Sequence, residues 1–172
     1  MSITKLSSAL AFALLLTTPI YANAPPPPPV EAAQGVAPEI FVKSLYDTLA
    51  ESESVSPELG AATLDSVVLA HFTPDLLALY KTAYDIPEPI IDGNVIWDSQ
   101  EWDPKVEVAT KTTAKDATTA TVEASYKLGA ETRTVTYALK ALREGWQIDD
   151  ITGGAGSLRK WLAEGIAGYK PQ

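Results

Sequence analysis

The chain of 172 residues contains no cysteine, one histidine and one methionine. Without a thiol it can form no disulfide, no cysteine nucleophile and no cysteine-ligated metal site. The same absence excludes a lipid anchor on a cysteine after an export signal. We therefore predict no metal site and no cofactor. A domain without disulfides must be stabilised by its core, and 46% of the residues are hydrophobic.

Positive charge is also scarce. Thirteen Lys and Arg residues stand against 22 Asp and Glu, which gives a net charge of -9 and a pI near 4.5. Nucleic acids and anionic lipid surfaces both require clustered Lys and Arg. We expect no nucleic-acid partner, and no membrane binding once the signal described next is removed. A cationic partner fits this charge, although acidity alone also serves solubility.

The first residues have the pattern of an export signal. Lys5 is the one charge, residues 10–16 are the apolar run LAFALLL, and Ala22-Asn23-Ala24 is a small-x-small triplet. Signal peptidase recognises these three parts, and the apolar run is much shorter than the roughly 20 residues of a membrane span. We predict cleavage after Ala24 and a periplasmic or secreted location. An uncleaved N-terminal anchor is the alternative.

The chain divides into three parts on this basis. Residues 1–24 are the signal peptide, and residues 25–36 form a tether that opens with five prolines and favours polyproline II. Residues 37–168 are long enough for one domain of ordinary size.

The first half of this domain has a helical period. Apolar residues recur every four positions from Phe41 to Leu49, which predicts an amphipathic helix over 38–50. Ser-Pro-Glu at 56–58 and Thr-Pro-Asp at 73–75 each combine a capping residue, a proline for the first turn and an acid. They predict the starts of two more helices.

The second half alternates between apolar and polar residues, which is typical of half-buried antiparallel strands. The alternation predicts four strands, at 105–108, 120–127, 134–140 and from 146 onward. The turns at 128–130 and 144–145 are too short for crossover helices. Ser157 is expected to cap a last helix, with Trp146 and Trp161 in the core.

The predicted fold class is α+β, with N-terminal helices packed in a curved, four-stranded antiparallel meander and a C-terminal helix. The outer sheet face is polar, and this leaves a homodimer through that face open. Its residues include Thr121, Glu123, Thr134 and Thr136.

Five short segments resemble, in order and spacing, a family of small exported bacterial domains of unknown function. They are His71-Phe72-Thr73-Pro74-Asp75-Leu76, Ile91-Asp92-Gly93-Asn94, Gln100-Glu101-Trp102-Asp103, Trp146-Gln147-Ile148-Asp149-Asp150-Ile151 and Gly156-Ser157-Leu158-Arg159. The resemblance spans 38–165 and implies a nuclear-transport-factor-two-like, or cystatin-like, cone fold. The family pattern has Asp at the position of Asn94. The resemblance implies no activity, because cone folds include enzymes, binding modules and scaffolds.

Asp149 and Asp150 are the main candidate site residues. If their strand alternates regularly, Asp150 shares a face with Trp146 and Ile148, where an unpaired carboxylate is costly. Asp150 is then either a general base or ligand anchor, or a structural group that pairs with Arg159 or caps the last helix. We favour the structural interpretation.

His71 and Tyr80 are the other catalytic candidates. His71 is the natural acid or base at neutral pH, but a hydrogen-bonded histidine at a helix junction is the simpler interpretation. Tyr80 or Tyr126 could donate a hydrogen bond to a substrate. No Ser-His-Asp arrangement is indicated.

Two irregular segments, 92–102 and 153–157, are also candidate binding loops. Trp97 and Trp102 flank Gln100 in an irregular segment, and they form either a lid or partner surface or a plug at the open end of the cone. Asp92, Asn94 and Asp98 do not match a calcium loop, because Ile96 stands where an oxygen ligand is needed. The glycine-rich loop at 153–157 matches neither nucleotide-binding fingerprint.

We interpret the chain as an exported, non-catalytic binding or accessory domain for an envelope protein or a small ligand. The residues expected to bind are Trp97, Gln100, Trp102, Asp149, Asp150 and Arg159. One alternative is an isomerase or dehydratase with Asp150 as base. Another is an inhibitor or immunity-type protein for a basic target.

Signal cleavage can be tested directly. The mass of the exported protein should match a chain that begins at Pro25, because signal peptidase requires small side chains at the positions of Ala22 and Ala24. Replacing both alanines with Asp should leave the uncleaved precursor. A wild-type product that still carries residues 1–24 would show that the segment is an anchor.

Overall fold

A computed structural model describes residues 35–87, 90–91, 93–99 and 103–170. The predicted cleavage site at Ala24, the tether up to residue 34, Gln100 and Trp102 lie outside the described residues. In the described part of the chain, no helix combines the length and apolar character that a bilayer crossing needs.

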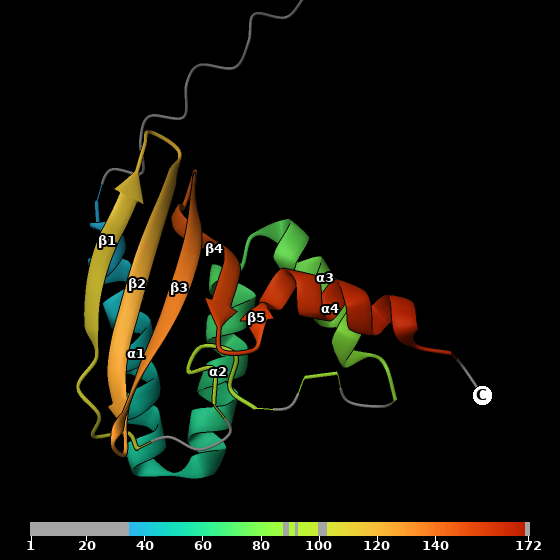
Figure 1. The fold of residues 1–172 in the computed structure, drawn as a ribbon, viewed down its shortest axis with the longest axis horizontal. Helices are drawn as coiled ribbons and strands as arrows, with labels where there is room; N and C mark the ends of the chain where they lie inside the picture. Colours follow the sequence, from blue (N-terminus) through green and yellow to red (C-terminus); the bar gives the residue numbers. More distant parts are fainter. Residues whose placement is uncertain (1–34, 88–89, 92, 100–102, 171–172) are drawn as a thin grey trace, which may run out of the picture.

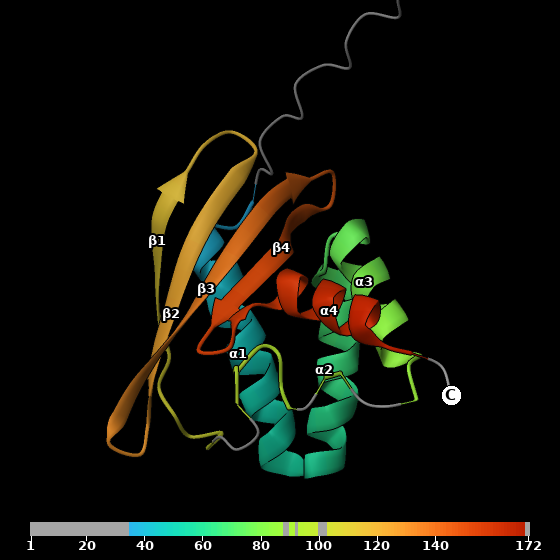
Figure 2. The same ribbon diagram turned by 45° about the vertical axis from the view of Figure 1, so that its right-hand side comes forward.

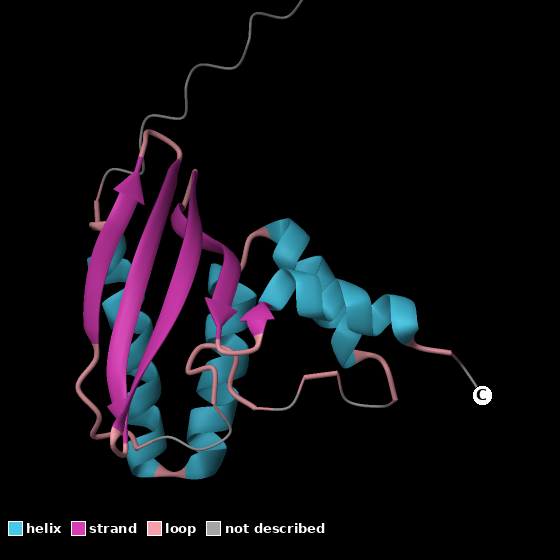
Figure 3. Cartoon of the chain, in the orientation of Figure 1, coloured by secondary structure: helices cyan, strands magenta, loops and turns pink. Residues whose placement is uncertain are grey.

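The fold is α+β, with three helices before an antiparallel sheet and one helix after it (Figures 1 and 3). The elements are α1 (Pro38–Val55), α2 (Pro57–His71), α3 (Pro74–Tyr84), β1 (Ala109–Lys115), β2 (Thr119–Leu128), β3 (Glu131–Leu142), β4 (Gly145–Gly153), β5 (Gly156–Ser157) and α4 (Leu158–Gly168). The sheet order is β1-β2-β3-β4-β5. Figures 1 and 2 show α1 along one face of the sheet, and α3 packed on α4 beyond β4.

The helix starts are where the capping residues predict them. Ser56 Oγ accepts a hydrogen bond of 3.2 Å from the Leu59 N–H at the start of α2. Thr73 caps α3 in the same way, and Ser157 Oγ accepts from the Lys160 N–H at 3.1 Å in α4. Each cap satisfies one of the backbone donors that a helix start leaves free.

Two boundaries differ from the prediction. Helix α1 continues to Val55 instead of ending near residue 50, and Ser52 is buried within it, with its hydroxyl donating to the Leu49 carbonyl. The first strand is β1 and not 105–108, because the Val106 N–H closes a turn on the Asp103 carbonyl. The sheet has four long strands in meander order, as predicted in number, three of them at the predicted positions, and a short fifth, β5.

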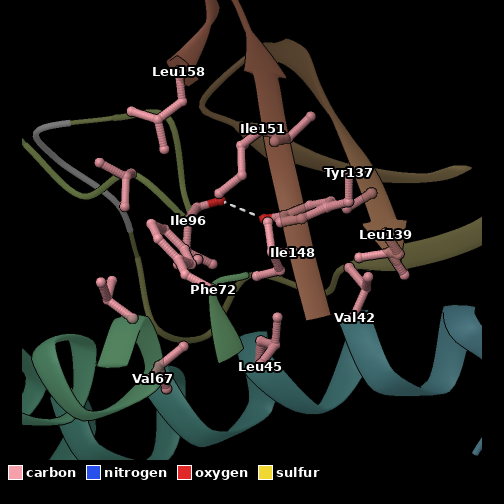
Figure 4. Packing of buried hydrophobic residues seen from close by; sticks show 14 of the residues in the cluster. Val42, Leu45, Val67, Phe72, Ile96, Tyr137, Leu139, Ile148, Ile151 and Leu158 are labelled. Atoms are coloured by element: carbon pink, nitrogen blue, oxygen red, sulfur yellow. Dashed lines mark hydrogen bonds between the residues drawn. The ribbon is translucent and has the colours of Figure 1, made fainter. Parts of the chain in front are cut away.

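The core lies between the helices and the inner face of the sheet. It contains a segment that belongs to neither layer: Ile96 and Trp97 have no exposed surface, although they lie in the loop region between α3 and β1. Figure 4 shows Ile96 between Tyr137 of β3, Ile151 of β4 and Phe72. We call residues 93–99 the plug, since the side chains of Val95, Ile96 and Trp97 in this segment are part of the core.

Tyrosine hydroxyls hold the plug through its backbone. Tyr46 Oη lies 3.0 Å from the Ile96 carbonyl oxygen, and Tyr137 Oη lies 2.7 Å from both the same oxygen and Tyr46 Oη. The Tyr126 hydroxyl donates to the Trp97 carbonyl. Burial raises the pKa of Tyr137 well above its usual value and that of Tyr126 to about 12, so both stay protonated donors at neutral pH.

Tyr137→Phe tests how much this network stabilises the fold. The change leaves the ring but removes a buried hydroxyl that bonds Tyr46 and the Ile96 carbonyl. We expect the free energy of unfolding in urea to fall by about 1–3 kcal/mol, the typical cost of an unsatisfied buried polar group. Tyr84→Phe is the matched control, because Tyr84 is 71% exposed. Equal stability of the two variants would contradict the assigned role.

Candidate functional site

The plug meets the end of the sheet at an open hollow of about 280 Å³, which we call the α4 hollow. One wall comes from the plug, and the other comes from the end of β4, the connection that follows it and the start of α4. Its lining residues are Gly93, Asn94, Val95, Asp98, Ser99, Ile151, Gly153, Ala155, Gly156, Ser157, Leu158 and Trp161.

A β-bulge decides which β4 residues face the core. The pairing of β3 with β4 shifts by one residue between Ile148 and Asp150, so Asp149 is the extra residue. Beyond the shift Ile151 is buried, and Asp150 is only partly buried. The regular alternation that placed Asp150 on the face of Trp146 and Ile148 is therefore wrong.

Asp150 joins the strand end to the start of α4. Its Oδ1 accepts hydrogen bonds of 2.9 Å from the backbone N–H groups of Ile151 and Arg159, and its Oδ2 accepts one of 2.6 Å from the Ser157 hydroxyl. These contacts have the geometry of a helix cap. Asp150 is also absent from the lining of the α4 hollow.

Asp149, and not Asp150, pairs with Arg159. Asp149 Oδ1 lies 2.9 Å from Arg159 Nη2 and 3.0 Å from Lys140 Nζ, and it accepts a 3.1 Å hydrogen bond from the Thr73 hydroxyl. Partial burial acts to raise the pKa of Asp149, but Lys140, Thr73 and Arg159 together lower it. Asp149 thus connects β3, β4, α4 and the start of α3.

The Asp149 cluster predicts a pH-dependent contribution to stability. Asp149→Asn should lower the free energy of unfolding by about 1–2 kcal/mol at pH 7, because charged groups lose a partly buried partner. A lowered folded pKa makes this contribution present above the unfolded value near 4, and it is lost as the pH falls through the folded pKa. The difference in the free energy of unfolding between the two proteins should therefore begin to shrink below about pH 4, and it should vanish only below the folded pKa.

Asp47→Asn is the control for this comparison. Asp47 pairs with Lys43 on one exposed face of α1, and its side chain is 61% exposed. Its removal should change stability little at any pH. A constant difference between wild type and Asp149→Asn from pH 3 to pH 7 would contradict the ionic role.

The other catalytic candidates lie elsewhere. The His71 ring packs edge-on against Phe41 at 5.4 Å, and burial lowers its pKa, so the imidazole is neutral at pH 7. Tyr80 packs against Phe72 between α2 and α3. Among the contacts of the described residues, none joins His71 or Tyr80 to Asp150.

The burial of the three described tryptophans differs in part from the prediction. Trp97 is fully buried, so its position fits the plug alternative and its ring forms no partner surface. Trp146 is in the core as expected, but Trp161 is 36% exposed and lines the α4 hollow. Leu158 and Leu162 are the buried residues of α4, and Trp161 lies at the flank of that stripe. Helical spacing gave no signal for this exposure, because the position three residues after Leu158 belongs to the expected apolar stripe.

Asp98 is a residue of the site whose role the sequence pattern did not indicate. It has a positive φ of 49°, and its Oδ2 accepts a 2.5 Å hydrogen bond from the Gly154 N–H. A Cβ atom at Gly153 would lie 2.1 Å from this oxygen, so the close approach requires glycine there. Asn94 stabilises the turn that leads to Asp98, because its Oδ1 accepts hydrogen bonds from the backbone N–H groups of Ile96 and Trp97.

Among the residues that the structure describes, no three His, Cys, Asp or Glu side chains are placed to hold a metal ion. The polar groups of the α4 hollow are one carboxylate, one amide and two hydroxyls. They can bind and orient a ligand.

The chain matches no family model and no curated protein sequence. A solved structure that it resembles is a phospholipid-binding protein from Ralstonia solanacearum, determined in complex with a phospholipid. The two chains are 16% identical, the match covers 75% of this chain and 85% of the other, and the TM-score is 0.49. At this degree of likeness, the ligand of one protein says nothing of the ligand of the other. The resemblance to a family of exported domains stays a prediction.

Proposed function

We propose that this chain is an exported, non-catalytic binding domain that takes a small amphipathic ligand in the α4 hollow. The observation that carries the proposal is that the exposed Trp161 ring and the Asp98 carboxylate line one hollow, together with apolar side chains. The export part of the proposal rests on the signal-like pattern of residues 1–24.

The apolar side supports a hydrophobic contact. Val95, Ile151 and Leu158 lie at the base of the α4 hollow and are almost fully buried, while Trp161 keeps 36% of its surface exposed. A large aromatic ring left exposed beside buried aliphatic groups gains free energy when a ligand covers it, at about 25 cal/mol per Å² of apolar area.

The polar side supports a ligand with a positive charge. Asp98 is the one charged residue in the lining, and its Oδ1 accepts no hydrogen bond from the described residues, whereas Oδ2 is held by Gly154. A cationic or zwitterionic end group can pair with Oδ1 and contact the face of Trp161. An anionic group would meet the repulsion of Asp98.

Fluorescence can test this proposal. Dodecyltrimethylammonium, added below its micelle concentration, should change the Trp emission, because it joins an apolar chain to a cationic end. Dodecyl sulfate should bind at least about ten-fold more weakly, a difference of roughly 1.4 kcal/mol. Trp161→Ala should abolish the emission change, and Asp98→Asn should remove the preference for the cation.

Lys160→Ala is the matched control, since Lys160 is a neighbour in α4, has a side chain that is 73% exposed and does not line the hollow. It should bind the cationic detergent as wild type does. Equal binding of the two detergents, or unchanged calorimetric binding by Trp161→Ala, would contradict the proposal.

A further inference from the structure

We infer that a groove between α2 and α3 is a second, separate interaction surface, and that it binds a basic amphipathic segment of a partner protein. The groove has a volume of about 290 Å³ and does not share residues with the α4 hollow. Its lining residues are Asp65, Val68, Leu69, Tyr80, Lys81, Tyr84 and Asp85.

The groove has an apolar floor and an apolar rim. Val68 and Tyr80 form the floor and are buried, whereas Leu69 of α2 is 56% exposed and Tyr84 of α3 is 71% exposed. Two large exposed side chains from neighbouring helices therefore line one hollow. Such a surface fits the apolar face of an amphipathic helix.

The charge of the chain is distributed very unevenly. Residues 38–87, which include α1, α2 and α3, carry eight acidic side chains and two lysines. Residues 103–170, which include the sheet and α4, carry nine acidic and ten basic side chains. The acidic excess is thus concentrated on the helical part of the fold, where it attracts a basic partner.

The rim of the groove repeats this charge pattern. Asp65 and Asp85 both line it, and within the described ranges neither makes an ion pair. Lys81 is the single base among the lining residues, and its flexible stem allows the ammonium group to point to solvent. An amphipathic basic segment fits both the apolar and the acidic part of this surface. Its leucines would contact Leu69 and Tyr84, and its lysines would pair with the carboxylates of Asp65 and Asp85.

A peptide titration tests this inference. The probe is a helical amphipathic peptide of leucine and lysine, and a scrambled peptide of the same composition is its reference. We expect the ordered peptide to bind with an affinity that falls as salt is raised. Leu69→Ser combined with Tyr84→Ser should weaken binding by about ten-fold or more. Asp65→Asn with Asp85→Asn should reduce the salt dependence.

The matched control is Ile40→Ser combined with Val55→Ser. These residues are 57% and 72% exposed, lie on α1 and do not line the groove. The control should bind the peptide as wild type does, and all four substitutions are at exposed positions where stability should change little. An equal loss in both double variants, or equal binding of the scrambled peptide, would overturn the inference. Self-association lost in Leu69→Ser/Tyr84→Ser would also overturn it, because a second copy would then be the occupant.

Discussion

Three tyrosine hydroxyls hold the backbone of the plug, and the other features of the molecule depend on this contact. Tyr46 and Tyr137 fix the Ile96 carbonyl, and Tyr126 fixes that of Trp97. Since α1, β2 and β3 each supply one hydroxyl, the network joins the helical layer to the sheet. It also positions the rest of the plug, so that Asp98 reaches the glycines at the end of β4.

Because side chains of the plug are part of the core, the candidate binding surfaces are hollows that open to the outside of the fold. An irregular segment inside a core normally carries unsatisfied backbone groups, and here tyrosine donors and the side chain of Asn94 satisfy several of them. The α4 hollow is lined by the outer residues of the same segment. One segment thus contributes both to the core and to the candidate site.

Much of the fold could be predicted from local signals. Ser56, Thr73 and Ser157 cap their helices as their sequence context indicates, and alternation located three of the long strands. The bulge at Asp149 could not be predicted, because it depends on pairing with β3 and leaves no local mark. The burial of the plug could not be predicted either, because no hydrophobic periodicity distinguishes a buried irregular segment from an exposed loop.

The most direct test of this account is an NMR titration of the tryptophan indole N–H signals with dodecyltrimethylammonium. Trp161 lies at the rim of the α4 hollow and Trp97 is fully buried within the plug. We predict that the Trp161 signal shifts with increasing ligand and that the Trp97 signal stays in place. A shift of the Trp97 signal with an unchanged Trp161 would show that the ligand enters the interior, and this would contradict the account.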